Sequence, residues 1–187
     1  MDRKLPKELY QIHNIAPKLY LSGIIPVASI KFPSIAKDHG IRLVISCSDH
    51  PNTSIYHQNL IRQNELECNQ PIYCIWIKYR DRCTQNLWNH NNDQDIVCSN
   101  NLDGEQDIEL LSLIQRSAGK PCIDVSYAFS DWAISRGYGV IIHCMAGVSR
   151  SVSMICYYLM KQTGCSMNDA LQHVKSIRII ANPNGSF

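Results

Sequence analysis

Short apolar runs bounded by glycine or polar residues recur along this chain and predict the strands of a sheet. The clearest runs are rich in β-branched and aromatic residues, which favour extended backbone. They are Leu19–Leu21, Ile41–Cys47, Ile72–Tyr79 and Tyr138–His143. Segments of helical length separate them, and strands that alternate with helices are typical of an α/β fold. We therefore expect a mainly parallel central sheet flanked by helices.

Apolar residues spaced three or four positions apart predict the helices. The segments with this spacing are 121–136, 149–162 and 166–177, and another segment of helical length lies around 27–39. Pro121 and Gly137 are typical of the start and the end of a helix, and Gly164 is a second helix end. Ser166 and Asp169 form the S-x-x-D pattern of a capping box, which predicts that the last helix begins there.

An asparagine-rich stretch interrupts this regular pattern. NLWNHNNDQDIVCSNNLDG, at residues 86–104, contains six asparagines and few strong helix or strand formers. We expect an inserted loop at about 83–119, in which only the segment 104–116 has the spacing of an amphipathic helix. Since no repeat or second core is visible, residues 1–187 are expected to form a single domain.

Composition and charge restrict the function classes only loosely. The chain is 45% hydrophobic and 18% charged, with a formal net charge of +2. This ordinary balance favours neither nucleic acid nor a membrane as a partner. Apolar runs fall short of the ~20 residues that span a bilayer, and no secretory signal is visible. We expect a cytoplasmic protein, with the nucleus as a second location, and a monomer.

The nine cysteines do not indicate a disulfide framework or a metal centre. They include no CxxC pair and no Cys/His spacing of a metal site. Eight are expected to be small apolar filler or bystander thiols: Cys47, Cys68, Cys74, Cys83, Cys98, Cys122, Cys156 and Cys165. We expect no metal and no cofactor.

The segment VIIHCMAGVSRSV, at residues 140–152, joins a predicted strand to a predicted helix through a short loop. Backbone amides of such a loop and the positive end of the helix form an anion site. Gly147 allows the turn, and Arg150 presents a planar fork of donors that matches two phosphate oxygens. Cys144 at the edge of this site is expected to have a lowered pKa and to attack a bound phosphate as a thiolate. The expected phosphate-binding residues are Met145, Ala146, Gly147, Val148, Ser149 and Arg150.

Two neighbours of this cysteine have alternative interpretations. His143 either hydrogen-bonds around the loop and supports the thiolate, or is a buried ring at the end of a strand. Ser151 either donates a hydrogen bond to the sulfur and eases its departure from phosphorus, or is an ordinary serine of the first helical turn.

HCMAGVSRS, at residues 143–151, resembles the HCxxGxSRS signature of the dual-specificity protein phosphatases, in the cysteine-dependent phosphatase superfamily. APKLYLSG at 16–23, GIRLVISCSDHP at 40–51 and SMNDALQHVKSIRIIANPN at 166–184 resemble further segments of that family. GVSRSV, NDAL and ANPN together are similar to small atypical members known as JNK-stimulatory phosphatases. The resemblance covers roughly residues 12–82 and 120–187, and it implies a further helix after Phe187, so the chain either is truncated there or lacks that element.

The resemblance implies a phosphatase of phosphotyrosine and of phosphoserine or phosphothreonine, with a phosphorylated protein as its partner. Cys144, Arg150 and Ser151 would act in catalysis. Asn182 and Asn184 would lie near the phosphate loop, either bracing it or forming turns around Pro183, and Arg178 would be structural.

The general acid is implied less directly. IKYRD, at residues 77–81, resembles the family pattern I-P-V-x-D, which makes Asp81 the acid and later the base that activates water. The separation of Asp81 and Cys144 is about twice what the resemblance implies, and the surplus matches the asparagine-rich insert. Asp103 and Asp107, which are nearer in sequence, and Asp124, in a predicted helix, remain alternatives.

Two other functions remain open: a phosphate-binding pseudophosphatase or scaffold, and the same chemistry on a non-protein phosphate ester. A pseudoenzyme usually lacks the nucleophile or the arginine, and both are present. The neutral loop residues Met145, Ala146 and Val148 differ from the lysine-containing loops of lipid phosphatases. The chain also lacks the basic aromatic segment that deepens the pocket of strictly tyrosine-specific relatives, so a shallow cleft that accepts both ester types is expected.

Overall fold

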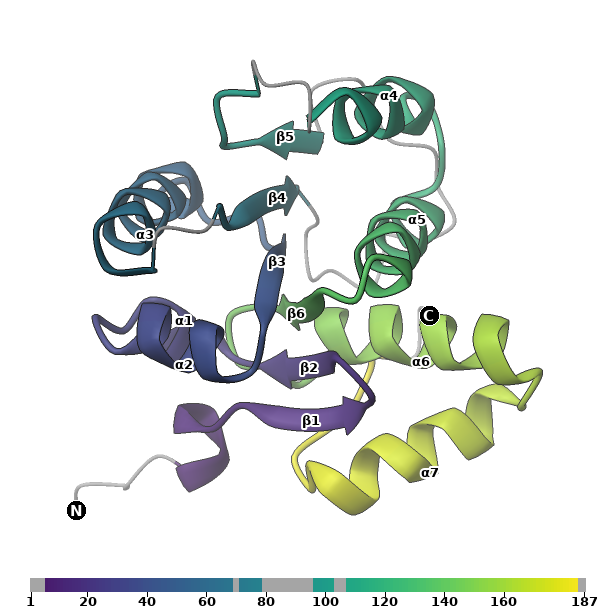
Figure 1. Ribbon diagram of the computed structural model, residues 1–187. Coiled ribbons are helices and arrows are strands. Elements are labelled where there is room, and N and C mark those ends of the chain that lie inside the picture. Colours follow the sequence, from purple (N-terminus) through teal and green to yellow (C-terminus); the bar gives the residue numbers. More distant parts are fainter. Residues whose placement is uncertain (1–5, 69–70, 79–95, 103–106, 185–187) are drawn as a thin grey trace.

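A single mixed sheet organises the computed structural model, which describes residues 6–68, 71–78, 96–102 and 107–184 (Figure 1). Its strand order is β1-β2-β6-β3-β4-β5. The strands are β1 (His13–Ala16), β2 (Leu19–Ser22), β3 (Ile41–Cys47), β4 (Tyr73–Ile77), β5 (Ile96–Cys98) and β6 (Gly139–His143). The inner strands β2, β6, β3 and β4 are parallel, whereas the edge strands β1 and β5 pair antiparallel. The predicted mainly parallel sheet is confirmed.

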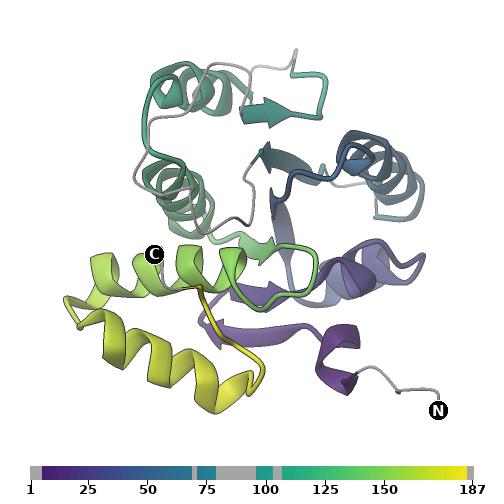
Figure 2. The ribbon, with the colours of Figure 1, turned by 180° about the vertical axis from the view of Figure 1, so that it is seen from behind.

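Helices cover both faces of this sheet (Figures 1 and 2). One layer holds α1 (Ile24–Val27), α2 (Phe32–Asp38) and α3 (Thr53–Cys68), and the other holds α4 (Ile108–Ser117), α5 (Cys122–Ser135), α6 (Arg150–Thr163) and α7 (Met167–Ile177). A 3₁₀ turn, η1 (Lys7–Tyr10), precedes β1. Successive strand residues point to opposite faces of the sheet and pack against different helix layers. Val44 belongs to the core cluster that contains Phe32 of α2, and Ile45 to the cluster that contains Phe129 of α5. The sheet is thus buried on both sides, which explains its nearly continuous apolar strands.

Three of the helices follow the sequence prediction closely. Helix α5 lies within the predicted segment 121–136, and α6 ends at Gly164, which adopts a left-handed φ of 72°. The capping box at the start of α7 is confirmed, because the Ser166 hydroxyl accepts a hydrogen bond from the Asp169 amide and the Asp169 carboxylate accepts one from the Ser166 amide.

Other elements differ from the prediction. The segment 27–39 holds α2 preceded by the separate short helix α1, and Pro33 lies in the first turn of α2, where proline is tolerated. Helix α3 was not predicted, because exposed Ile55 and Leu66 blur its apolar stripe. Within the expected insert, α4 overlaps the predicted helix and β5 is an additional strand that pairs with β4.

The carboxyl ends of the inner strands meet at one edge of the sheet. Ser22 and Ser46 are both register partners of His143, and Cys47 is the partner of Ile77. Residues that follow these strands therefore gather in one place, where ligands of open α/β sheets bind. Of the helices that the structure describes, none has the length and apolar character needed to span a bilayer.

Candidate active site

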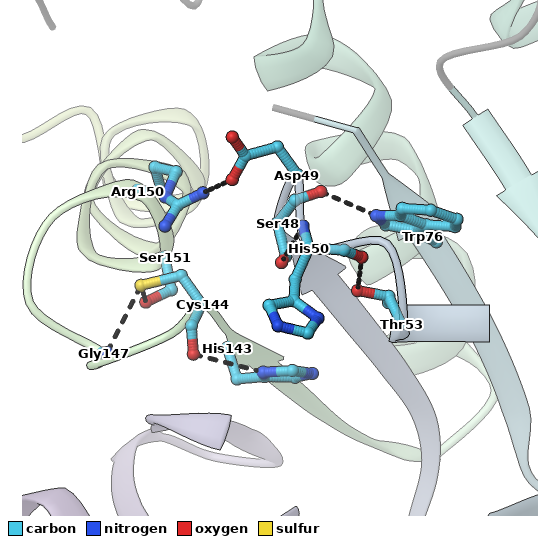
Figure 3. A network of polar contacts seen from close by, with 10 residues as sticks. All are labelled: Ser48, Asp49, His50, Thr53, Trp76, His143, Cys144, Gly147, Arg150 and Ser151. Carbon is cyan, nitrogen blue, oxygen red and sulfur yellow. Dashed lines mark hydrogen bonds and ion pairs between the residues drawn. The ribbon is translucent and has the colours of Figure 1, made fainter. Parts of the chain in front are cut away.

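The loop that connects β6 to α6 surrounds the sulfur of Cys144 (Figure 3). The Cys144 side chain is buried, with 3% of its surface exposed. Its Sγ accepts hydrogen bonds from the Gly147 amide at 3.3 Å and from the Ser151 hydroxyl at 3.2 Å. The sulfur therefore lies at the amino-terminal end of α6, where the helix dipole favours a negative charge.

Polar contacts keep the Cys144 thiol acidic although it is buried. Burial raises the pKa of Cys144, but the hydroxyl and amide of Ser151 and the charge of Arg150 together lower that pKa below its usual value. The Val148 amide acts in the same direction. The thiolate is thus favoured by hydrogen bonds that the loop has already formed, and a thiolate is the nucleophilic form of cysteine.

Donors from the carboxyl-terminal segment hold the outer side of this loop. The buried Arg178 guanidinium donates from Nε to the Gly147 carbonyl at 2.7 Å and from a terminal nitrogen to the Ala146 carbonyl at 2.8 Å. The Asn182 amide donates to the Val148 carbonyl at 2.7 Å. Because these carbonyls are turned outward, the loop amides can converge on the site of an anion. The prediction that Arg178 is structural is confirmed.

The other asparagine of the ANPN segment contacts the end of the loop. The Asn184 amide donates to the Ser149 hydroxyl at 3.1 Å. Both asparagines therefore brace the loop through their backbone amides, one on a carbonyl and one on a side chain.

Arg150 lies in the first turn of α6 and forms an ion pair with a residue that the sequence did not single out. Its Nη1 is 3.1 Å from Oδ1 of Asp49, which follows β3 (Figure 3). Arg150 is buried, whereas 48% of the Asp49 side chain is exposed. The Asp49 carboxylate, at the mouth of the phosphate loop, thus orients the Arg150 guanidinium.

The segment that carries Asp49 is fixed by hydrogen bonds on both sides. The Trp76 indole donates to the Ser48 carbonyl at 2.6 Å, and the Ser48 hydroxyl accepts from the His50 amide at 3.0 Å. The Thr53 hydroxyl donates to the His50 carbonyl at 2.7 Å. Polar residues, Ser48, Asp49 and His50, follow the apolar run of β3 at the same end of the sheet as Cys144. This change from apolar to polar residues is the sequence signal that could have placed Asp49 in the site.

His143 contacts the backbone of Cys144. It is a fully buried ring at the end of β6, and its Nδ1 lies 3.4 Å from the Cys144 carbonyl. Its Nε2 contacts the hydroxyl groups of Ser46, at 2.5 Å, and of Tyr56. Burial lowers the pKa of His143 to about 4, so the ring is neutral at pH 7.

The candidate acids divide into those that lie elsewhere and those outside the described residues. Asp107 accepts a hydrogen bond from Tyr73, the first residue of β4, at the sheet edge opposite Cys144. Asp124 in α5 accepts one from Tyr157 of α6 at 2.5 Å. Both alternatives are therefore occupied in contacts away from the loop. Asp81 and Asp103 fall outside the described residues.

The described part of the chain contains no group of three or more histidine, cysteine or acidic side chains arranged to hold a metal ion. The cysteines described there are all free thiols. The polar groups around Cys144 include the Gly147 amide, the Ser151 hydroxyl and the Arg150 guanidinium with its partner Asp49.

Comparison with known proteins identifies this arrangement. The family model for the dual specificity phosphatase catalytic domain matches residues 24–187. "Putative tyrosine-protein phosphatase R622" of Acanthamoeba polyphaga mimivirus is 33% identical over 180 residues, which cover 96% of this chain and 82% of that protein. "Tyrosine-protein phosphatase yvh1" of Schizosaccharomyces pombe is 24% identical over 183 residues, which cover 97% of this chain and 41% of that protein.

Solved structures share the fold. Human DUSP28 matches with a TM-score of 0.59 and 19% identity, over 97% of this chain and 88% of that one. The human tyrosine phosphatase-like serine/threonine/tyrosine-interacting protein matches with a TM-score of 0.61 and 19% identity, over 95% of this chain and 90% of that one. The family match includes the whole loop around Cys144. The chain belongs to the dual specificity phosphatase family, and it is a cysteine-dependent protein phosphatase.

Proposed function

We propose that this chain hydrolyses phosphotyrosine and phosphoserine or phosphothreonine in proteins through a phosphocysteine intermediate. The observation that carries the proposal is the Cys144 sulfur, which accepts hydrogen bonds from the Gly147 amide and the Ser151 hydroxyl at the start of α6. The thiolate is the nucleophilic form of cysteine, and these hydrogen bonds fix its position. Covalent catalysis needs both a charged nucleophile and a fixed position.

In the first step the Cys144 sulfur attacks phosphorus, and the bond from phosphorus to the ester oxygen breaks. The loop amides of residues 145–149 and the Arg150 guanidinium stabilise the charge on the equatorial oxygens. Asp81 donates a proton to the leaving oxygen. The position of Asp81 four residues after the end of β4 supports this role, because Ile77 is the register partner of Cys47 at the edge that holds the site.

In the second step water attacks the phosphocysteine, and Asp81, now a carboxylate, takes the proton of that water. The sulfur leaves as a thiolate. Ser151 assists this departure, because its hydroxyl donates to the sulfur on which the negative charge develops. His143 supports the loop from below through the Cys144 carbonyl, and Asn182 supports it through the Val148 carbonyl.

The choice of substrate follows from the loop and its surroundings. The neutral side chains of Met145, Ala146 and Val148 favour protein phosphoesters over polyanionic lipid headgroups, and a shallow cleft accepts both ester types. We also propose a monomer of one domain that acts in the cytoplasm or nucleus without nucleic acid or membrane as partner. The free thiols of the described cysteines support a reducing compartment.

A binding protein without turnover is the competing function. One structural neighbour is named a tyrosine phosphatase-like interacting protein, but its likeness to this chain concerns the fold alone. The contacts of Cys144 and Arg150 favour catalysis, since a binding site alone needs no acidic thiol.

The test is phosphate release from a phenyl phosphate, measured against pH for the wild type, Cys144→Ser and Asp81→Asn. We expect the serine variant to be inactive and the asparagine variant to be slow, with the basic limb of its profile flattened. Activity retained by Cys144→Ser would overturn the mechanism. An unchanged profile of Asp81→Asn would overturn the acid assignment alone. Parallel assays on phosphotyrosine and phosphothreonine peptides and on phosphoinositides test the substrate class.

A further inference from the structure

A buried cluster of polar side chains lies directly beneath the phosphate loop. Its centre is the Ser46 hydroxyl, which is 2.5 Å from the Tyr56 hydroxyl, 2.7 Å from Nε2 of His57 and 2.5 Å from Nε2 of His143. Ser46, His57 and His143 have no exposed surface. Polar groups are seldom buried together unless their hydrogen bonds are satisfied, so this cluster is costly to assemble and sensitive to the loss of one member.

Strand register and one helix bring these groups together. Ser46 of β3 and His143 of β6 are register partners, and both point to the face that α3 covers. Tyr56 and His57 come from the first turns of α3, and the Tyr56 ring packs edge-on against both imidazoles. Val44, which lies two residues before Ser46 on the same face of β3, belongs to the apolar core. The polar residues on this face are therefore confined to the strand end near Cys144.

His57 extends this cluster to the segment after β5, the outermost strand on that side of the sheet. Its Nδ1 is 2.8 Å from the hydroxyl of Ser99, the residue that follows β5. The Ser99 amide donates to the Cys74 carbonyl at 3.0 Å. The side chain of Asn100 accepts from the Cys74 amide at 2.8 Å and donates to the Ile72 carbonyl at 2.7 Å. Ser99 is therefore held in place against β4, and its hydroxyl faces His57.

Both imidazoles in this cluster carry one proton each. Burial lowers the pKa of His57 to about 3 and the pKa of His143 to about 4, so both rings are neutral at pH 7. Burial also raises the pKa of Tyr56 well above its usual value, so its hydroxyl remains a donor.

Placing the His143 proton on Nδ1, where it faces the Cys144 carbonyl, assigns one continuous direction of donation to these contacts. In this assignment the Ser99 hydroxyl donates to Nδ1 of His57, and Nε2 of His57 donates its proton to Ser46. Ser46 then donates to Tyr56, and Tyr56 donates to Nε2 of His143. The remaining ring proton of His143, on Nδ1, is directed at the Cys144 carbonyl. In this assignment every proton in the series has an acceptor, and His57 is the donor to Ser46.

We propose that His57 is a positioning residue for the nucleophile, and that Ser99 connects the β5 segment to Cys144 through it. His57 touches no part of the phosphate site. Its donated proton sets the direction of the hydrogen bonds at Ser46 and Tyr56, which hold His143 in the tautomer that faces the Cys144 carbonyl. Without that donor the His143 ring can rotate, and the loop amides lose their common direction toward the sulfur. The inference uses Cys144 as the nucleophile of the proposed function and goes beyond it.

The test measures how fast iodoacetamide alkylates Cys144 at different pH values, followed by mass spectrometry of the peptide that contains Cys144. This reaction reports the thiolate without turnover, so it is independent of whether phosphate esters are hydrolysed. The variants are His57→Phe, which keeps a ring of similar size, and Ser99→Ala. We expect the alkylation midpoint to rise by about half a pH unit or more in His57→Phe. We expect a smaller rise in the same direction in Ser99→Ala.

Two control variants separate positioning from stability. Ser130→Ala removes another serine hydroxyl, which donates within α5, and Leu60→Val removes a methylene from the core beneath α3. Both are expected to keep the wild-type midpoint. His57→Gln, which restores a donor and an acceptor, is expected to lie between the wild type and His57→Phe.

A folded His57→Phe variant with the wild-type midpoint would overturn the proposal. If His57→Phe does not fold, Ser99→Ala decides, and a wild-type midpoint there has the same meaning. Failure of the proposed function appears differently, as phosphate release that persists in Cys144→Ser while the alkylation midpoints still shift.

Discussion

Arg178 and Gly147 constrain each other from two directions. The Arg178 Nε donates to the Gly147 carbonyl at 2.7 Å, and a β-carbon on Gly147 would lie 2.7 Å from a terminal nitrogen of the same guanidinium. That β-carbon would also lie 2.4 Å from the Ser22 carbonyl oxygen, and Gly147 has a φ of 66°. The turn of the phosphate loop thus requires a residue without a β-carbon at Gly147, in addition to the hydrogen-bond donors around the loop.

Gly147→Ala should therefore disrupt the loop. The contact with the Ser22 backbone cannot be relieved by rotating a side chain, so we expect a loss of about 2–4 kcal/mol in the free energy of unfolding and activity lowered by ~100-fold or more. Gly164→Ala is the matched control, since Gly164 has a φ of 72° with open space around it. It should cost about 1 kcal/mol and leave the rate constant unchanged. Urea unfolding and phosphate release measure both, and equal effects of the two variants would contradict this account.

Replacing Arg178 should leave three backbone carbonyls without their hydrogen-bond donor. Arg178 donates to Ala146, Gly147 and Glu8, and each unsatisfied buried acceptor costs ~1–3 kcal/mol. We expect Arg178→Met to lower the free energy of unfolding by about 3–5 kcal/mol. Arg62→Met, at an exposed position of α3, should change it by less than about 0.5 kcal/mol. Urea titrations that show similar midpoints for the two variants would refute the bracing role.

Asp49 should affect substrate binding more than the chemical step. A half-exposed ion pair is worth about 0.5–1 kcal/mol, so Asp49→Ala should raise KM by about two- to fivefold while kcat changes little. Asp49→Asn keeps an oxygen acceptor for Arg150 and should lie closer to the wild type. Steady-state kinetics on a phenyl phosphate across pH measure this. A lower KM would mean that Asp49 competes with phosphate, and a flattened limb of the pH profile would make Asp49 the proton donor.

The two buried histidines should make the fold less stable in acid. Their pKa values of about 3 for His57 and about 4 for His143 lie below the value of ~6.5 expected in the unfolded chain. Unfolding therefore takes up protons below pH ~6.5, so the stability these residues contribute is complete above that pH and is lost as the pH falls toward about 4.

The loss should approach ~1.4 kcal/mol per pH unit for each histidine, in addition to the effect of the carboxylates. Urea unfolding of the wild type and His57→Phe between pH 7.5 and 4.5 measures it, and the variant should show the shallower fall. Leu60→Val should shift the whole curve without changing its shape. Parallel curves for the wild type and His57→Phe would rule out a neutral buried His57.

The inner strands and the nucleophile were predictable because their signals are local. Strands β2, β3, β4 and β6 are buried on both faces, so each is an apolar run bounded by turn residues, and Cys144 and Arg150 belong to one loop whose geometry follows from a strand, a glycine and a helix. Strand β5 has only three residues in an asparagine-rich stretch, and its extended form depends on pairing with β4. No pattern within its own sequence indicates this.

The rest of the site was not predictable because it joins residues far apart in the chain. Asp49 reaches Arg150 only because β3 and β6 are neighbours, and His57 reaches Ser46 only because α3 packs on that end of the sheet. Helix α3 itself has a weak apolar stripe, so neither Tyr56 nor His57 was assigned to a face. Polar residues at the ends of strands that share one sheet edge are the general signal that sequence reading can use.

The central claim is that Cys144 carries the phosphoryl group during turnover. Ser151→Ala removes the hydroxyl that donates to the departing sulfur, so the second step should slow by ~10- to 100-fold and the intermediate should accumulate. The decisive measurement is mass spectrometry of the peptide that contains Cys144 after rapid acid quenching of Ser151→Ala with a phenyl phosphate. The account predicts a phosphate group on Cys144 in this variant and none in Cys144→Ser. Continued phosphate release from a Cys144 that never carries phosphate would contradict it.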